Sequence, residues 1–117
     1  MVSYEIYVIE LNRVLDYIME KSYSIKARVW LYPGMAGWHF VTIPKKITEI
    51  IDYYFRQAKR GWGSLPVLVT IGKTSWKTSI FPDKKSDSYL LPLKAEVRKK
   101  EAIKAGDSIH FSLNIED

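Results

Sequence analysis

The alternation of apolar and polar residues predicts a domain built mainly from β-strands. Apolar side chains recur at every second position in several short stretches, which is the period of a strand with one buried face. These stretches are residues 25–32, 38–43, 67–71, 76–81, 88–91 and 109–115. In the first stretch, the residues expected to share the buried face are Ile25, Ala27, Val29 and Leu31. Turns are expected at Pro33-Gly34, Gly72-Lys73 and Gly106-Asp107, and a polar turn at residues 82–87.

Three other stretches carry apolar residues at the spacing of a helix. The first predicts an amphipathic helix over residues 5–20, although residues 2–8 also alternate like a strand; its stripe is Tyr4, Val8, Leu11, Leu15 and Ile18. The second is expected to begin at Pro44 and to end at Gly61-Trp62-Gly63, with a buried stripe of Ile47, Ile50, Ile51, Tyr54 and Ala58. The third follows Leu91-Pro92 and covers residues 94–101.

The order of these elements indicates an internal repeat. Strand, strand, helix and strand occur over residues 24–72 and again over residues 75–116, with Pro44 and Pro92 at the two strand-to-helix junctions. This order predicts a mainly β fold with capping helices, in the form of a small six-stranded pseudo-twofold β-barrel with an N-terminal helix. Closure of the barrel would remove exposed strand edges. The alternative is an open α+β sandwich.

Composition and charge agree with one soluble domain. The chain has 117 residues, of which 47% are hydrophobic and 26% charged, and no cysteine, which excludes disulfides and thiolate chemistry and fits a cytoplasmic protein. Neither a secretion signal nor a membrane span is expected. Residues 1–22 carry two basic and four acidic side chains, whereas residues 23–117 carry sixteen basic and nine acidic ones. We therefore expect a helical N-terminal segment, residues 1–22, and a basic barrel domain, residues 23–117.

Several motifs in the barrel region occur in the order typical of one family. They are Gly37-Trp38-His39-Phe40-Val41, Pro44, Gly61-Trp62-Gly63, Val67, Trp76-Lys77-Thr78-Ser79-Ile80-Phe81-Pro82, Tyr89-Leu90-Leu91-Pro92-Leu93-Lys94, Arg98 and Gly106-Asp107. This series resembles a small prokaryotic domain family catalogued as domain of unknown function 1905, over about residues 23–116. The resemblance implies a small β-barrel and brings no established activity.

The residues offer little support for an enzyme. Gly72-Lys73-Thr74 looks like the end of a P-loop, but Val67 stands where that motif needs a glycine, and a strand follows instead of a helix. The two histidines, His39 and His110, are isolated among strand residues and predict no metal site. Ser79 has no activating base in any recognisable motif. We therefore expect no catalytic residue, no metal and no cofactor.

Aromatic, hydroxyl and basic residues converge in residues 74–98, where a ligand is most plausible. The candidate ligand-binding residues are Trp62, Trp76, Lys77, Thr78, Ser79, Tyr89, Lys94 and Arg98. Trp38 and Trp76 are also expected in the core, and both interpretations stay open for Trp62. Arg98 can fork onto a phosphate or a carboxylate, or can pair structurally with Asp83, Asp87 or Glu96.

Two functions follow as hypotheses. The first is a non-catalytic module that binds an anionic ligand, with nucleic acid among the candidates, because aromatic rings beside cations can stack bases and attract phosphates. The second is a protein-interaction or self-assembly domain that uses the apolar stripe of the N-terminal helix, which would make a homo-oligomer. No membrane partner is expected in either case.

Overall fold

The computed structural model describes residue 11, residues 21–35 and residues 37–116. The N-terminal helix expected over residues 5–20 lies outside the described residues, apart from Leu11. The division into a helical segment and a barrel domain, and the self-assembly assigned to that helix, therefore stay predictions.

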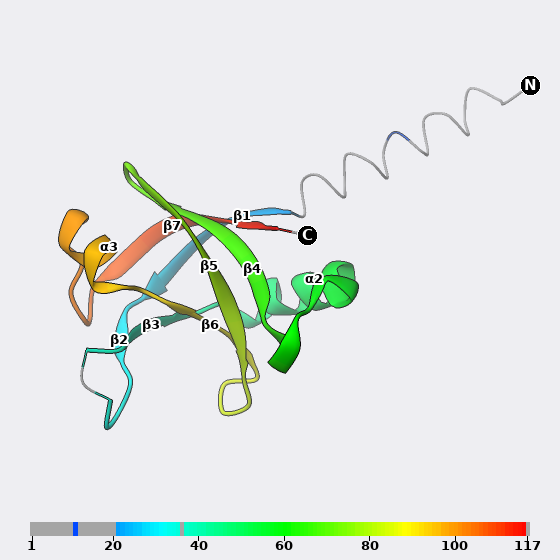
Figure 1. The fold of residues 1–117 in the computed structure, drawn as a ribbon, viewed down its shortest axis with the longest axis horizontal. Helices are drawn as coiled ribbons and strands as arrows, with labels where there is room; N and C mark the ends of the chain where they lie inside the picture. Colours follow the sequence, from blue (N-terminus) through cyan, green and yellow to red (C-terminus); the bar gives the residue numbers. More distant parts are fainter. Residues whose placement is uncertain (1–10, 12–20, 36, 117) are drawn as a thin grey trace, which may run out of the picture.

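Seven antiparallel strands form one sheet that curls into a half-barrel (Figure 1). Their order across the sheet is β1-β7-β4-β5-β6-β3-β2. The strands are β1 (Ser22–Arg28), β2 (Trp30–Leu31), β3 (His39–Thr42), β4 (Leu65–Ile71), β5 (Thr74–Asp83), β6 (Ser88–Pro92) and β7 (Ser108–Ile115). The mainly β fold is thus confirmed, with β5 running past Pro82, where a turn was expected.

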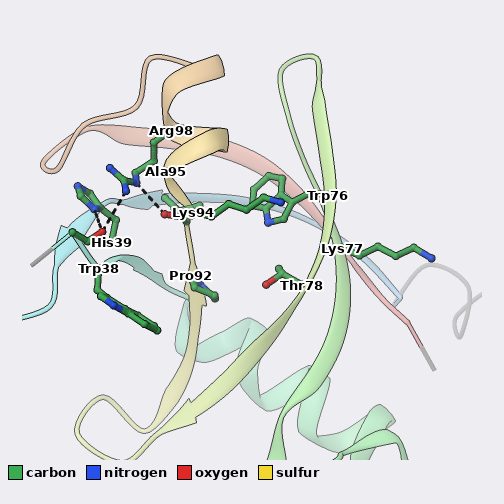
Figure 2. A pocket seen from close by; sticks show the side chains of 11 residues that line it. Trp38, His39, Trp76, Lys77, Thr78, Pro92, Lys94, Ala95 and Arg98 are labelled. Atoms are coloured by element: carbon green, nitrogen blue, oxygen red, sulfur yellow. Dashed lines mark hydrogen bonds between the residues drawn. The ribbon is translucent and has the colours of Figure 1, made fainter. Parts of the chain in front are cut away.

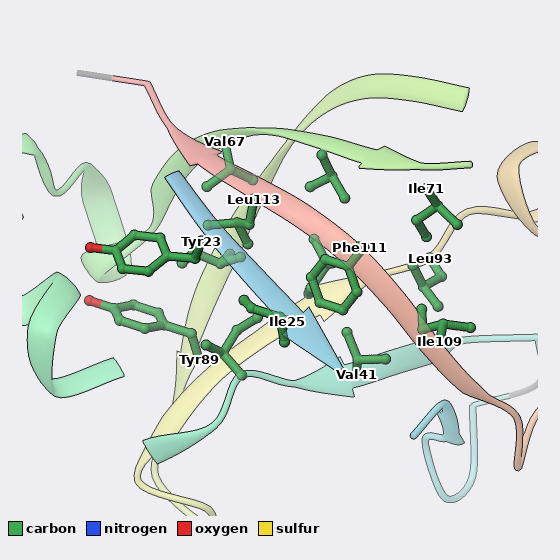
Figure 3. Packing of buried hydrophobic residues seen from close by; sticks show 14 of the residues in the cluster. Tyr23, Ile25, Val41, Val67, Ile71, Tyr89, Leu93, Ile109, Phe111 and Leu113 are labelled. Atoms are coloured by element: carbon green, nitrogen blue, oxygen red, sulfur yellow. The ribbon is translucent and has the colours of Figure 1, made fainter. Parts of the chain in front are cut away.

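The inner face of the curled sheet holds the core (Figure 3). Every second residue of β4 is buried, from Leu65 to Ile71, and β7 buries Ile109, Phe111, Leu113 and Ile115 in the same way. Each strand was predicted with this alternation because a strand that covers a core turns alternate side chains inward. One core residue of β5, Trp76, also lines the pocket described below.

The pairing partner of the first strand region changes at Val29, between β1 and β2. The amide of Val29 donates to the carbonyl of Asp107 at 2.8 Å, and its carbonyl accepts from the amide of Gly106 at 2.8 Å. Before this point β1 pairs with β7, and after it β2 pairs with β3. The predicted burial of Leu31 is wrong, since Leu31 lies opposite His39 beyond the last core residue of this stretch and is about half exposed.

The helix α2 (Lys45–Phe55) begins one residue later than predicted. Pro44 has an extended ψ of 141° and is the N-cap residue, so it precedes the helix instead of occupying its first position. The helix buries Thr48, Ile51 and Phe55 at i, i+3 and i+7. The predicted stripe was rotated slightly, because it placed Tyr54 inward, where the structure leaves this ring exposed.

Short helical turns complete the chain. Two 3₁₀ turns, η1 (Arg56–Ala58) and η2 (Gly61–Gly63), connect α2 to β4. The helix α3 (Ala95–Lys100) follows β6, with Lys94 as its N-cap residue and Pro92 as the last residue of the strand. No helix in the described part of the chain has both the length and the apolar character needed to cross a bilayer.

Candidate ligand pocket

A pocket of about 490 Å³ opens between β3, β5 and the connection from β6 to α3 (Figure 2). Trp38 reaches it from the residue before β3 and His39 from the first residue of that strand, while Trp76 and Thr78 reach it from the middle of β5. Leu93, Lys94 and Arg98 close the remaining side from the β6–α3 connection and from α3 itself. The pocket therefore joins three segments that are far apart in sequence.

Arg98 is held in the pocket by backbone carbonyls. Its Nε donates to the carbonyl of Leu93 at 3.0 Å, and its Nη2 donates to the carbonyl of Gly37 at 3.3 Å. The first bond ties the side chain to the segment before its own helix, and the second ties α3 to the β2–β3 connection. The guanidinium is consequently oriented by two neutral acceptors.

The carboxylates that the sequence offered to Arg98 have other partners. Asp87 pairs with Lys45 at 2.7 Å, Glu96 pairs with Lys100 at 3.2 Å, and Asp83 accepts hydrogen bonds from Ser86. Among the described residues, no carboxylate lies within ion-pair distance of Arg98. The prediction that Arg98 pairs with Asp83, Asp87 or Glu96 is therefore wrong. None of these carboxylates neutralises the positive charge of the Arg98 side chain.

His39 shares an acceptor with Arg98. Its Nδ1 lies 2.9 Å from the carbonyl of Gly37, and because a carbonyl can only accept, Nδ1 carries the proton. In the neutral ring, Nε2 is then left as an acceptor. Gly37 has a positive φ of 81°, a conformation that glycine adopts without steric cost. The carbonyl of this one glycine accepts hydrogen bonds from two pocket side chains.

Two tryptophans form much of the apolar wall. Trp76 is only 8% exposed and belongs to the hydrophobic core, as predicted, while one part of it lines the pocket. Trp38 is 52% exposed, so the prediction that it belongs to the core is wrong. Trp38 precedes β3 and shares a side of the hairpin with Phe40, whereas the core residue of that strand is Val41. Trp38 therefore points away from the core cluster that contains Val41, and it is exposed although Phe40 on the same side is buried.

The two lysines at the pocket differ in direction. In Figure 2 the side chain of Lys94 runs toward Trp76, and that of Lys77 points away from the pocket. The ammonium of Lys77 lies 3.8 Å from the carboxylate of Glu116. That of Lys94 lies 4.0 Å from Glu96, whose pKa is lowered mainly by its hydrogen bond to Lys100 and further by Lys94. Lys94 is thus the second cation that can reach a ligand.

The structure brings together five of the eight candidate residues: Trp76, Lys77, Thr78, Lys94 and Arg98. Ser79 does not line the pocket; it alternates with Thr78 on β5 and lies opposite Pro66 of β4. Trp62 is 96% exposed in the η2 turn and also lies outside the pocket. Conversely, Trp38, His39 and Leu93 line the pocket but are not among the candidate ligand-binding residues that the sequence predicts.

Tyr89 belongs to a separate cavity of about 150 Å³ beside α2. Its buried hydroxyl donates to Oδ1 of Asp52 at 2.6 Å, and Nζ of Lys59 lies 2.9 Å from the same oxygen. Burial, together with the Asp52 carboxylate, raises the pKa of Tyr89 well above its ordinary value. The hydrogen bond between Tyr89 and Asp52 connects β6 to α2. Tyr89 does not line the pocket that contains Arg98.

Within the described residues, no group of three or more His, Cys, Asp or Glu side chains is placed to hold a metal ion. The described lining of the pocket contains no carboxylate, and its titratable side chains are His39, Lys77, Lys94 and Arg98. The pocket can therefore attract and orient an anion.

No curated protein matches this chain. A family model described as Domain of unknown function (DUF1905) matches residues 26–113. This span begins in β1 and ends in β7, so it contains every segment that contributes to the pocket. The chain therefore belongs to the family named domain of unknown function 1905.

Proposed function

We propose that this domain is a non-catalytic binding module whose pocket holds an anionic ligand with an apolar or aromatic part. The observation that carries the proposal is the geometry of Arg98. Two backbone carbonyls orient its guanidinium at the edge of an apolar pocket, and the described residues place no carboxylate beside it.

A guanidinium held in this way is well suited to bind an anion. It has five N–H donors in a planar fork, and the two bonds to Leu93 and Gly37 leave donors for a ligand. Because the side chain is already ordered, binding costs little additional side-chain entropy. Lys94, on the same side of the pocket, can add a second, more exposed charge.

The volume and the apolar lining of the pocket favour a ligand that has an apolar part as well as a charge. Its volume of about 490 Å³ lies in the range of small-molecule sites and exceeds what a free phosphate needs. Trp38, Trp76 and Leu93 supply apolar surface, and Thr78 supplies one hydroxyl that points into the space beside Pro92 (Figure 2). An aromatic acid or a phosphorylated aromatic group would match both parts.

Three probes separate these contributions. Calorimetric titrations with phenyl phosphate, inorganic phosphate and phenol should show phenyl phosphate binding most tightly, because only this probe uses both the cation and the apolar wall. Arg98→Ala should abolish that preference, whereas Lys99→Ala, which removes a neighbouring cation outside the pocket, should leave it unchanged. Equal binding of phenyl phosphate by both variants would refute the proposal.

We also propose that the half-barrel closes as a six-stranded pseudo-twofold barrel. In this interpretation β1 and β2 are one strand interrupted at Val29, which pairs with β7 in its first part and with β3 in its second. The element order supports it, since strand, strand, helix and strand occur on both sides of the β4–β5 turn. Cross-strand NOEs from Ala27 to Ile109 and from Trp30 to Phe40 are expected together. If the NOE between Trp30 and Phe40 is absent, β2 does not pair with β3, the sheet is open, and the proposed closure is wrong.

A further inference from the structure

Four aromatic rings pack against one another on the hairpin formed by β2 and β3, and we call Trp30, Tyr32, Trp38 and Phe40 the hairpin aromatic cluster. The ring centroids of Trp30, Tyr32 and Trp38 lie 5.5, 5.8 and 5.8 Å from that of Phe40. Trp30 and Tyr32 are stacked at 6.0 Å. Phe40 is buried, but it lies outside the main cluster of core residues, to which its strand contributes Val41.

The exposed members of the cluster form a pair at the end of the hairpin. The amide of Tyr32 donates to the carbonyl of Trp38 at 2.9 Å, which fixes the two residues opposite each other. Tyr32 is 41% exposed and Trp38 52%, and both rings lie against the buried ring of Phe40. The hairpin therefore presents two aromatic rings whose positions are set by a third.

This cluster is continuous with the pocket, because Trp38 belongs to both. A ligand anchored near Arg98 and in contact with Trp38 can extend across the hairpin to Tyr32 without leaving aromatic surface. The pocket alone does not use Tyr32, which is absent from its lining. The combined surface therefore fits a chain-like ligand better than an isolated small molecule.

We infer that the pocket and the hairpin aromatic cluster together bind single-stranded nucleic acid, with a phosphate at Arg98 and bases stacked on Trp38 and Tyr32. The inference rests on the proposed function, since it assigns the class of anion. Exposed aromatic rings beside cations are the usual platform for single strands, because every base has a face that can stack.

The charge of the domain favours this occupant over a peptide that would also use aromatic rings. Residues 21–116 carry seventeen basic and eight acidic side chains. On the α3 side of the pocket, Lys94, Arg98, Lys99 and Lys100 outnumber Glu96 and Glu101. A phosphate backbone complements such an excess, whereas a neutral proline-rich peptide would need only the aromatic groove.

A length series tests the inference. Fluorescence polarisation with labelled oligothymidylates, from the mononucleotide to the octanucleotide, should show affinity rising with length and falling as salt is raised. Tyr32→Ala should weaken octanucleotide binding by about fivefold or more and leave phenyl phosphate binding unchanged. The matched control is Tyr53→Ala, which removes a tyrosine that is 77% exposed on α2. Circular dichroism melts should show both variants folded.

The outcomes distinguish this inference from the proposed function. If phenyl phosphate binds in an Arg98-dependent way but the octanucleotide binds no tighter than the mononucleotide, the inference is overturned and the pocket proposal stands. Unchanged octanucleotide affinity in Tyr32→Ala also overturns it, as would equal affinity for duplex DNA. Tyr32-dependent binding of a proline-rich peptide without oligonucleotide binding would assign the surface to a protein partner. Failure of phenyl phosphate to bind would refute the proposal that the pocket binds an anionic ligand.

Discussion

Replacing Arg98 by alanine should lower the stability of the domain as well as remove its anion site. The side chain connects three segments, because it grows from α3 and donates to carbonyls of Leu93 and Gly37. Its loss leaves both carbonyls without this partner and removes the link between α3 and the start of β3. The effect should therefore be larger than that of an ordinary surface arginine.

The expected magnitude follows from these two bonds. A hydrogen bond with a charged donor contributes about 1.5–3 kcal/mol when it is well formed, and the bond to Gly37 is long at 3.3 Å. Because Arg98 is only half-buried, water can replace part of what is lost. We expect a decrease of about 1–3 kcal/mol in the free energy of unfolding. Arg98→Lys should recover only part of it, since an ammonium cannot reproduce the fork.

Chemical denaturation measured by tryptophan fluorescence checks this expectation, with Lys99→Ala as the matched control. Lys99 lies in the same last turn of α3, so its removal costs the same favourable interaction with the helix dipole, but it is exposed. The control should stay within about 0.5 kcal/mol of the parent protein. A loss as small for Arg98→Ala as for Lys99→Ala would show that the two carbonyl bonds do not hold the pocket together.

Four further variants test other parts of the fold. Gly72→Ala should destabilise the β4–β5 turn by about 1 kcal/mol or more in denaturant melts, because Gly72 has a φ of +56° and a Cβ there would collide with the carboxylate of Glu101. Ile51→Pro should cost about 3 kcal/mol or more, whereas Pro44→Ala should cost at most about 1 kcal/mol; equal small losses would contradict the helix. The pKa of Tyr89 is raised in the folded protein. Its contribution to the free energy of unfolding is therefore complete below the pKa of tyrosine in the unfolded chain, about 10, and is lost as the pH rises further. Tyr89→Phe should therefore show a weaker alkaline loss of stability, and an unchanged alkaline slope would count against the buried bond to Asp52.

Much of the sheet could be predicted because its strands cover a core on one face. In β4, β5 and β7 the alternation of apolar residues matches the observed burial of residues such as Val67, Trp76 and Phe111. The periodicity of a strand follows from backbone geometry, so it is visible in the sequence whenever one face is buried. The glycine at position 72 then correctly predicted the turn of the β4–β5 hairpin.

The errors occur where the core ends. Leu31 and Trp38 belong to strand-like stretches, but both lie near the turn of the β2–β3 hairpin, beyond the core, where alternation no longer implies burial. Tyr54 was placed inward because a helical stripe is wide enough for neighbouring positions to compete, and Phe55 occupies the buried position instead. Only the three-dimensional packing decides these cases.

The site could be predicted only in part for a related reason. The stretch from Trp76 to Arg98 did contain the main cation and the buried tryptophan of the pocket. The acceptors that orient Arg98 are main-chain carbonyls of Leu93 and Gly37, and a carbonyl carries no signature in a sequence. Tyr89 was predicted as a ligand residue because the sequence does not show that its hydroxyl bonds to Asp52, which lies 37 residues earlier in the chain.

The most direct test of the pocket uses the four tryptophans of the chain as reporters. In ¹⁵N-edited NMR spectra each indole N–H gives one signal, and the signals can be assigned by single Trp→Phe substitutions. On titration with phenyl phosphate, the signals of Trp38 and Trp76 should shift saturably, while that of Trp62, outside the pocket and almost fully exposed, should stay in place. Shifts confined to Trp62, or no saturable shift of Trp38 and Trp76, would contradict the anion pocket.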